Sequence, residues 1–338
     1  MWPAKGIVAR RALLLGLAAG ILPAAAAPPE PAAWRVGLIA GTDPWSASLA
    51  AGAAAAAERI NRAGGINDHP LVLTSLPVAR PWQDGAARIA RLAAAPGTVA
   101  LLGAADGAEA HLAAQVATRL RLPLITVSPE VTLTQAGSTW VFRAVADDRE
   151  QARSLLARLP GGAAGRRGVL VVPAGREGRE RLAALRRACA ESGMNQVDLL
   201  TVPEAAAGLQ PPPPARGDIV LLWLDAGPAR RLLERWGERL PSVPVLGSSR
   251  LNHPAFLRGL HPGGTMLPGG RAESPQRLGR DLVNRLATAL AQTDGDTDAL
   301  RATLAVTPFF SGKKGRPTLT RHGNRREADP ARVSSAER

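Results

Sequence analysis

Residues 34–76 read WRVGLIAGTDPWSASLAAGAAAAAERINRAGGINDHPLVLTSL, and this stretch decides the fold class. It opens with a short apolar segment at 34–40 and passes through an alanine-rich segment at 46–63 that two glycines end. It closes with a second apolar segment at 70–76. This order predicts a strand, a helix and a strand, which is the repeating unit of a parallel sheet.

The alternation of strand and helix continues far beyond this stretch. Further strands are predicted at 99–103, 122–127, 168–172, 197–202, 218–224 and 243–247. Further helices are predicted at 82–95, 107–120, 179–192 and 228–239. Because the pattern restarts at Gly168, we predict an α/β fold with two doubly wound parallel-sheet lobes in series.

The last third of the chain has less regular structure. After the second unit, helices are predicted at about 276–292 and at about 297–305. From about Lys313 the chain becomes polar and basic, and residues 327–338 have the composition of a disordered tail.

The N-terminus has the three parts of a secretory signal peptide. Lys5, Arg10 and Arg11 precede an apolar run at 12–22, and small residues follow. The run is too short to cross a bilayer, which takes about 20 residues. We expect a signal peptide over residues 1–26, cleaved near Ala26, and a mature protein in the periplasm. An uncleaved membrane anchor and export by the twin-arginine route are the alternatives.

The composition disfavours several classes of function. The formal net charge is +14, which could indicate nucleic acid as a partner. However, the arginines are spread along the predicted helices, aromatic residues make up 3% of the chain, and export is expected. We therefore expect no nucleic-acid partner. Cys189 is the only cysteine, so no disulfide forms within the chain, and we expect it to be a buried helix residue.

Motifs for catalysis are absent from the sequence. It contains no G-x-S-x-G, no H-E-x-x-H and no G-x-x-x-x-G-K motif, and its five histidines lack metal-ligand spacing. We expect no catalytic residues, metal or cofactor. In open α/β sheets, ligands bind beyond the carboxyl ends of the strands, and two lobes facing each other form a cleft that can close around a ligand.

Four groups of short motifs occur in one order along the chain. They are ERINRAGGIN at 58–67; PLITVSP at 123–129 with LTQAG at 133–137, WVFR at 140–143, and Asp147, Asp148 and Gln151; VLGS at 245–248; and FSGKKG at 310–315 with HGN at 322–324. With these motifs the sequence resembles the type I periplasmic binding proteins, in particular the leucine/isoleucine/valine-binding type that serves ABC importers. The resemblance covers roughly residues 34–326.

The resemblance implies two discontinuous lobes joined by a hinge of three crossings. Lobe 1 would hold 34–145 and 249–307, and lobe 2 would hold 146–248 and 308–326. The stretch 249–307 is shorter than is usual in the family and lacks a tyrosine-rich segment, so lobe 1 is expected to miss an element.

The resemblance also implies ligand-binding positions. Trp45 falls where the family often has an aromatic side chain lining the cleft; packing beneath the loop is the alternative. Gly107 replaces a serine that binds the ligand carboxylate in the family. Backbone N–H groups at 107–109 could still serve, but the neighbouring Asp106 works against an anion.

Five further positions carry over in the same way. Ser128 matches a position that offers a backbone group and a hydroxyl. Glu130, or the proline before it with a shift of one residue, matches a threonine. Glu177 and Asp225 stand at aromatic positions, and Ser249 lies near the acid that pairs with the ligand ammonium in the family.

The matched positions favour a particular ligand charge. Asp106, Glu130, Glu177 and Asp225 could ring the cleft, although each could instead be a solvated loop acid. No arginine falls on a matched position. We therefore expect a cationic or neutral polar ligand rather than a simple aliphatic α-amino acid.

The sequence thus favours a periplasmic solute-binding protein that captures a small polar ligand, such as an amine, an amide or an amino-acid-like molecule, for an ABC importer. Its expected partners are the ligand and an ABC permease, and a monomer is expected. The alternative is a sensing or accessory envelope protein of the same fold that regulates a receptor or dehydrogenase system. An enzyme is the third and least favoured class.

Overall fold

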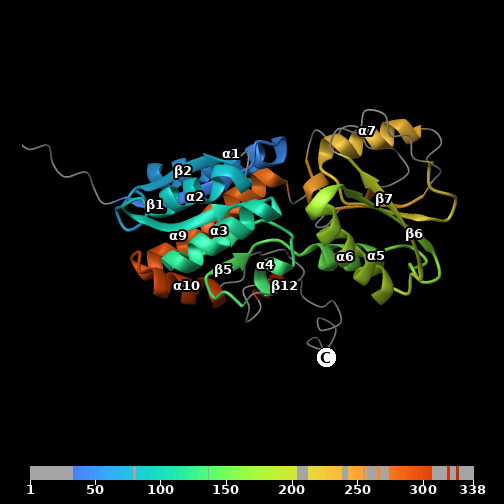
Figure 1. Ribbon diagram of the computed structural model, residues 1–338. Helices are drawn as coiled ribbons and strands as arrows, with labels where there is room; N and C mark the ends of the chain where they lie inside the picture. The colour runs from blue at the N-terminus through green and yellow to red at the C-terminus, as the bar shows by residue number, and fades with distance from the viewer. Residues whose placement is uncertain are drawn as a thin grey trace, which may run out of the picture. The chain divides into compact units, whose positions relative to one another are not determined.

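Two parallel β-sheets organise the described part of the chain (Figure 1). The computed structural model describes residues 33–78, 81–135, 137–203, 212–237, 243–253, 256, 265–266, 274–306, 318–319 and 325–326. The expected signal peptide, the expected disordered tail and the motifs at 310–315 and 322–324 lie outside these residues.

The first sheet has the strand order β2-β1-β3-β4-β5, and every neighbouring pair is parallel. Its strands are β1 (Trp34–Ala40), β2 (Leu71–Pro77), β3 (Thr98–Gly103), β4 (Leu124–Thr126) and β5 (Val141–Arg143). The chain moves outward from β1 to one side and then to the other, so the point where its direction reverses lies between β1 and β3.

The second sheet repeats this order as β7-β6-β8-β9-β10, again with parallel pairs. Its strands are β6 (Arg167–Pro173), β7 (Gln196–Val202), β8 (Ile219–Leu222), β9 (Val245–Gly247) and β10 (Thr265–Met266). Its reversal point lies between β6 and β8. Two further short strands, β11 (Thr318–Leu319) and β12 (Arg325–Arg326), form an antiparallel pair. The predicted α/β class with two doubly wound parallel sheets is confirmed.

Helices pack on both faces of the sheets. The helices of the first sheet are α1 (Pro44–Arg62), the π-helical turn η1 (Pro81–Gly85), α2 (Ala86–Ala93), α3 (Gly107–Leu120), α4 (Thr132–Gln135), α9 (Pro275–Thr293) and α10 (Thr297–Val306). The helices of the second sheet are α5 (Asp148–Ala157), α6 (Gly175–Glu191), α7 (Ala226–Trp236) and the 3-10 turn η3 (Ser249–Leu251). None of the described helices is both long and apolar enough to cross a membrane.

The cores follow from the alternation of side chains along each strand. Leu101 packs on one face of the first sheet in a cluster with Ile89, whereas its neighbour Leu102 packs on the other face with Leu49 and Leu282. The second sheet is built in the same way, with α5 and α6 on one face and α7 on the other. Strands buried on both faces have apolar runs of the kind the sequence shows.

The late helix α9 completes the core of the first sheet by packing against α1 (Figure 1). The two backbones touch. A Cβ added at Gly52 would lie 1.8 Å from the carbonyl oxygen of Gln276, and one at Gly279 would lie 2.0 Å from that of Leu49. Glycine on both helices is what allows this approach. The exact lobe boundaries drawn from the resemblance remain a prediction.

Most elements lie within a few residues of their predicted bounds, but two predictions need correction. The helix predicted at 82–95 is a π-helical turn followed by the shorter helix α2. The helix predicted at 179–192 begins at Gly175. The glycine-rich start of α6 has the composition of a turn, but a Cβ on Gly178 would lie 1.7 Å from the carbonyl oxygen of Pro173, so glycine is needed where the helix leaves β6.

Several elements were not predicted as strand or helix: β5, α5, and the short elements α4, η3, β10, β11 and β12. The strand β5 is short, and α5 begins with a polar turn. Its N-terminus carries a capping box, in which the Asp147 side chain accepts from the backbone N–H of Glu150 and the Glu150 side chain accepts from that of Asp147. Local hydrogen bonds of this kind start a helix without a strong apolar period.

We expect Gly279→Ala to destabilise the protein. The added methyl forces α1 and α9 apart, and overpacking of this kind costs about 1–3 kcal/mol. Urea unfolding measures the loss. Gly227→Ala is the matched control, because Gly227 is exposed in α7 and its added Cβ meets nothing closer than 3.5 Å. Equal stability of Gly279→Ala and the wild type would show that the close approach is not a constraint.

Candidate functional site

A cavity of about 360 Å³ opens at the carboxyl ends of strands from both sheets. This volume is within the range of small-molecule sites. The residues that line it come from loops and helix starts: Gly41, Thr42, Asp43, Val78, Pro81, Trp82, Asp106, Ala108, Glu109, Arg176, Glu177, Asp225 and Arg250.

The cavity lies where both sheets reverse their winding. Asp43 follows β1 and Asp106 follows β3, the two strands that flank the reversal point of the first sheet. Glu177 follows β6 and Asp225 follows β8, which flank that of the second sheet. This is the place where open α/β sheets bind their ligands.

Arg250 neutralises two acids that line the cavity, one beside each sheet. Its Nη2 lies 3.3 Å from Oδ1 of Asp43, and its Nε donates to Oδ1 of Asp225 at 3.1 Å. Its guanidinium carbon lies 4.8 Å from the ring centroid of Trp45. Arg250 is buried, so its charge needs these partners.

At each of these three groups the ion pairs and hydrogen bonds together affect the pKa more strongly than burial does. Burial would raise the pKa of Asp43, but Arg250 and hydrogen bonds from Ser46 leave this pKa below its usual value. Burial acts in the same direction on Asp225, whose pKa is nevertheless lowered by Arg250 and Arg181. Burial would lower the pKa of Arg250, but the two acids raise it, so all three groups stay charged at neutral pH.

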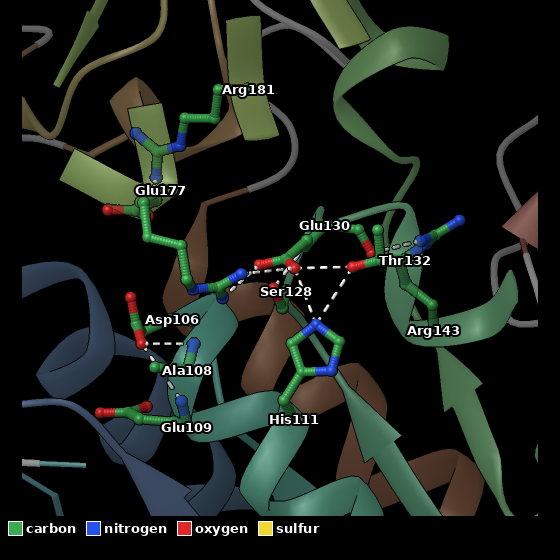
Figure 2. Close-up of polar contacts among 11 residues, drawn as sticks. Asp106, Ala108, Glu109, His111, Ser128, Glu130, Thr132, Arg143, Glu177 and Arg181 are labelled. Atoms are coloured by element: carbon green, nitrogen blue, oxygen red, sulfur yellow. Dashed lines mark hydrogen bonds and ion pairs between the residues drawn. The ribbon is translucent and has the colours of Figure 1, made fainter. Parts of the chain in front are cut away.

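The N-terminus of α3 is capped by the protein itself. Oδ1 of Asp106 accepts from the backbone N–H of Ala108 at 2.8 Å and from that of Glu109 at 3.1 Å (Figure 2). The resemblance left the N–H groups at 107–109 as a possible binding site for an anion, with Asp106 acting against it. At Ala108 and Glu109, Asp106 itself occupies these N–H groups.

Glu130 is held by side chains from three elements. Arg176 of α6 donates from Nη1 to Oε1 at 3.1 Å and from Nη2 to Oε2 at 2.9 Å. Oε1 also lies 2.6 Å from Oγ1 of Thr132 and 2.7 Å from Nε2 of His111 (Figure 2). A Cβ on Gly107 would lie 1.8 Å from Oε2. The missing side chain at Gly107 therefore leaves the place that the Glu130 carboxylate fills.

Ser128 and Glu130 lie beside a second, much smaller void. Its volume of about 10 Å³ holds about one water molecule. Gly107 and Glu177 also line it. The hydroxyl of Ser128 accepts from the backbone N–H of Glu130 at 3.4 Å, so it is already engaged within the protein.

The predicted residues divide into three groups. Asp106, Glu177 and Asp225 line the main cavity, whereas Gly107, Ser128 and Glu130 line the small void. Trp45 lies in the core, as in the packing alternative. The backbone N–H of Ser249 donates to Oε1 of Gln151 at 2.9 Å, and Ser249 is not among the lining residues.

Sequence reasoning missed several charged residues of the cavity: Asp43, Glu109, Arg176 and Arg250. No arginine falls on a position matched to the family, but two arginines line the cavity. Arg176 precedes Glu177 and Arg250 follows Ser249, so each is the chain neighbour of a residue chosen from the sequence. Asp43 had a local signal, because an aspartate before Pro44 is typical of a helix start.

Metal binding finds no support in the side-chain arrangement. Among the described residues, no three His, Cys, Asp or Glu side chains converge closely enough to hold a metal ion. What the site offers instead is hydrogen bonding and charge. Its carboxylates and guanidiniums can form hydrogen bonds and ion pairs with a small polar molecule.

We expect Arg176→Gln to lower stability in a pH-dependent way. Burial would raise the pKa of Glu130, but hydrogen bonds from Arg176, Thr132 and His111 leave it below its usual value near 4.5. The pair therefore stabilises the fold above pH 4.5, and this contribution is lost as the pH falls through the lowered pKa. Urea unfolding at pH 7 should show a loss of about 1–3 kcal/mol.

The difference between Arg176→Gln and the wild type should narrow toward pH 3. Arg179→Gln is the matched control, since Arg179 is exposed on the same helix. A loss of equal size at every pH would contradict an electrostatic role of the pair.

Comparison with known proteins identifies the family. Residues 37–214 match the periplasmic binding protein family. No curated protein sequence matches the chain. Among solved structures, LivJ from Streptococcus pneumoniae in complex with isoleucine has a TM-score of 0.68 at 17% identity, covering 87% of this chain and 94% of that one.

Two other structures are similar to the same degree. The leucine-binding protein LivK from Thermotoga maritima has a TM-score of 0.66 at 16% identity, covering 87% of this chain and 93% of that one. An ABC-transporter solute-binding protein from Rhodopseudomonas palustris, in complex with 3,4-dihydroxybenzoic acid, has a TM-score of 0.71 at 16% identity, covering 87% and 91%. At these identities the likeness shows the fold alone.

The family match spans more than half of the chain, and the two doubly wound sheets agree with the structural likeness. The resemblance stated from the sequence is confirmed. The chain belongs to the periplasmic binding protein family and has its type I fold.

Proposed function

We propose that this protein is a periplasmic solute-binding protein that captures a small polar ligand and delivers it to an ABC importer. The observation that carries this proposal is the cavity at the reversal points of both sheets, with ionisable side chains around it. Its family is a solute-binding family rather than an enzyme family. The similar structures named above are described as ABC-transporter substrate-binding or leucine-binding proteins.

The lining of the cavity bears on the class of ligand. Those relatives are described with isoleucine, leucine or a benzoic acid derivative, all of which carry a carboxylate. In this chain five carboxylates and two guanidiniums line the cavity, and Asp106 takes N–H groups that could have bound an anion. This balance supports an amine, an amide or another polar ligand over a simple acid.

A sensing or accessory role is the second candidate. The observation that favours it is the set of internal ion pairs at the site, in which Glu130 binds Arg176, and Asp43 and Asp225 bind Arg250. Stimulation of ATP hydrolysis by a reconstituted ABC permease would favour transport. Regulation of an envelope receptor or dehydrogenase without such stimulation would favour sensing.

We expect protein purified from the periplasm under native conditions to carry a small molecule in the cavity. Mass spectrometry of the denatured protein identifies it, and calorimetry measures how it rebinds. Thr42→Trp should weaken rebinding at least about tenfold, equivalent to about 1.4 kcal/mol, because the indole enters the cavity from an exposed loop.

Thr139→Trp is the matched control, since Thr139 is exposed and is not among the lining residues. Unchanged rebinding by the Thr42 variant would contradict the assignment of the cavity.

A further inference from the structure

We infer that the cavity binds an organic cation and that Glu109 is its counter-ion. This inference rests on the proposed function and names the ligand class of the same site. The argument depends on the surroundings of Glu109, on the charges around the cavity and on one exposed indole.

Glu109 is a buried acid with one unpartnered carboxylate oxygen, and no described side chain forms an ion pair with it. It lies in the first turn of α3, it is 3% exposed, and it lines the cavity. Its Oε2 has no hydrogen-bond partner. Asp106 takes the backbone N–H groups of Ala108 and Glu109, so this end of the helix has already used them on another carboxylate. A buried carboxylate with an unpartnered oxygen destabilises the protein unless a cation pairs with it or a proton neutralises it.

The charged groups that face Glu109 do not supply that cation. Asp106 is the N-cap residue of the same helix, Asp43 is the N-cap residue of α1, and Arg250 approaches from η3. Arg250 is the only one of these three that attracts a negative charge, and it is shared between Asp43 and Asp225. Burial raises the pKa of Glu109 to about 8, and the negative charge of Asp106 contributes to this rise. At pH 7 the group therefore mostly holds a proton.

Other features of the cavity match a cation that lacks a carboxylate. Arg176 is committed to Glu130, which fills the hollow left at Gly107. A ligand carboxylate therefore finds neither that arginine nor that space. Nη1 of Arg250 is buried without an acceptor, and a hydroxyl or carbonyl oxygen on the ligand would satisfy it.

Trp82 offers a surface that suits the same ligand. Its side chain is 67% exposed and lines the cavity from the π-helical turn η1. An indole face attracts alkylammonium groups. A cation held between this face and Glu109 would be paired with a carboxylate and shielded by an aromatic ring.

Binding of such a cation is coupled to a proton. A cation pairs with the ionised form of Glu109, so it displaces the proton that this group holds at pH 7. Because the free protein has a pKa near 8 at Glu109, affinity should rise by about tenfold per pH unit between pH 6 and pH 8, and then level off. About one proton per ligand should be released at pH 7.

Three probes with the same alkyl group test the inference. They are leucinol, a cation with a hydroxyl; leucine, a zwitterion; and 4-methylpentanoate, an anion. Isothermal titration calorimetry on the ligand-stripped full chain, in buffers of low and high ionisation enthalpy, measures affinity and proton release together. We expect leucinol to bind about tenfold or more tighter than leucine, and 4-methylpentanoate to bind least.

Glu109→Gln is the decisive variant, because glutamine copies the shape of the protonated acid and should preserve the melting temperature. It should lose about tenfold or more of the leucinol affinity, the proton release and the pH dependence. Glu58→Gln makes the same change at an exposed position of α1 and should leave all three unchanged.

The outcomes separate this inference from the proposed function. Leucine or 4-methylpentanoate binding as tightly as leucinol would overturn the cation site and leave the proposed function standing. Leucinol binding that Glu109→Gln does not weaken would overturn the role of Glu109. Absence of binding to all three probes would overturn the inference, and the molecule co-purified with the protein then decides the proposed function separately.

Discussion

The charge of Arg250 cannot be buried alone, and much of the site is arranged around that constraint. One of its partners, Asp43, comes from the start of α1 beside the first sheet, and the other, Asp225, precedes α7 beside the second. Asp43 also caps α1 by accepting from Trp45 and Ser46. Loss of either acid would leave a buried guanidinium with one partner fewer, which proteins tolerate poorly. The same three side chains therefore hold a helix start, a core tryptophan and a wall of the cavity.

The net charge of the cavity depends on which acids are paired with an arginine, and the number of acids alone does not give it. The acids visible in the sequence suggest a uniformly negative cleft, but most of them have a cation of their own. Glu130 binds Arg176, and Glu177 binds Arg181 one helical turn away. Glu109 forms no ion pair with the described side chains, and its buried Oε2 has no hydrogen-bond partner. Selectivity at such a site depends on the charge that remains unpaired.

The sequence predicted the fold far better than the site. Apolar runs such as GVLVV and IVLL had to be strands buried on both faces, and glycines marked the ends of helices. The strand β5 and the capped helix α5 were not predicted, because a strand of three residues and a helix started by a capping box leave little periodic signal. Arg176 and Arg250 were not predicted as site residues for a different reason. The sequence shows which residues follow a strand, but a shift of one position decides which side chain turns into the cavity.

The packing of α9 on α1 has a consequence for how the chain acquires its structure. Arg59 hydrogen-bonds Asn284, which is 225 positions further along the chain, so this contact closes a very long loop. The second sheet needs no such closure, since its strands follow one another within 167–266. During synthesis the apolar face of α1 must therefore wait for the last third of the chain. Contacts of such high sequence separation slow folding and leave apolar surface open to aggregation in the interval. The late position of α9 in the chain thus sets the earliest point of synthesis at which the first core can close.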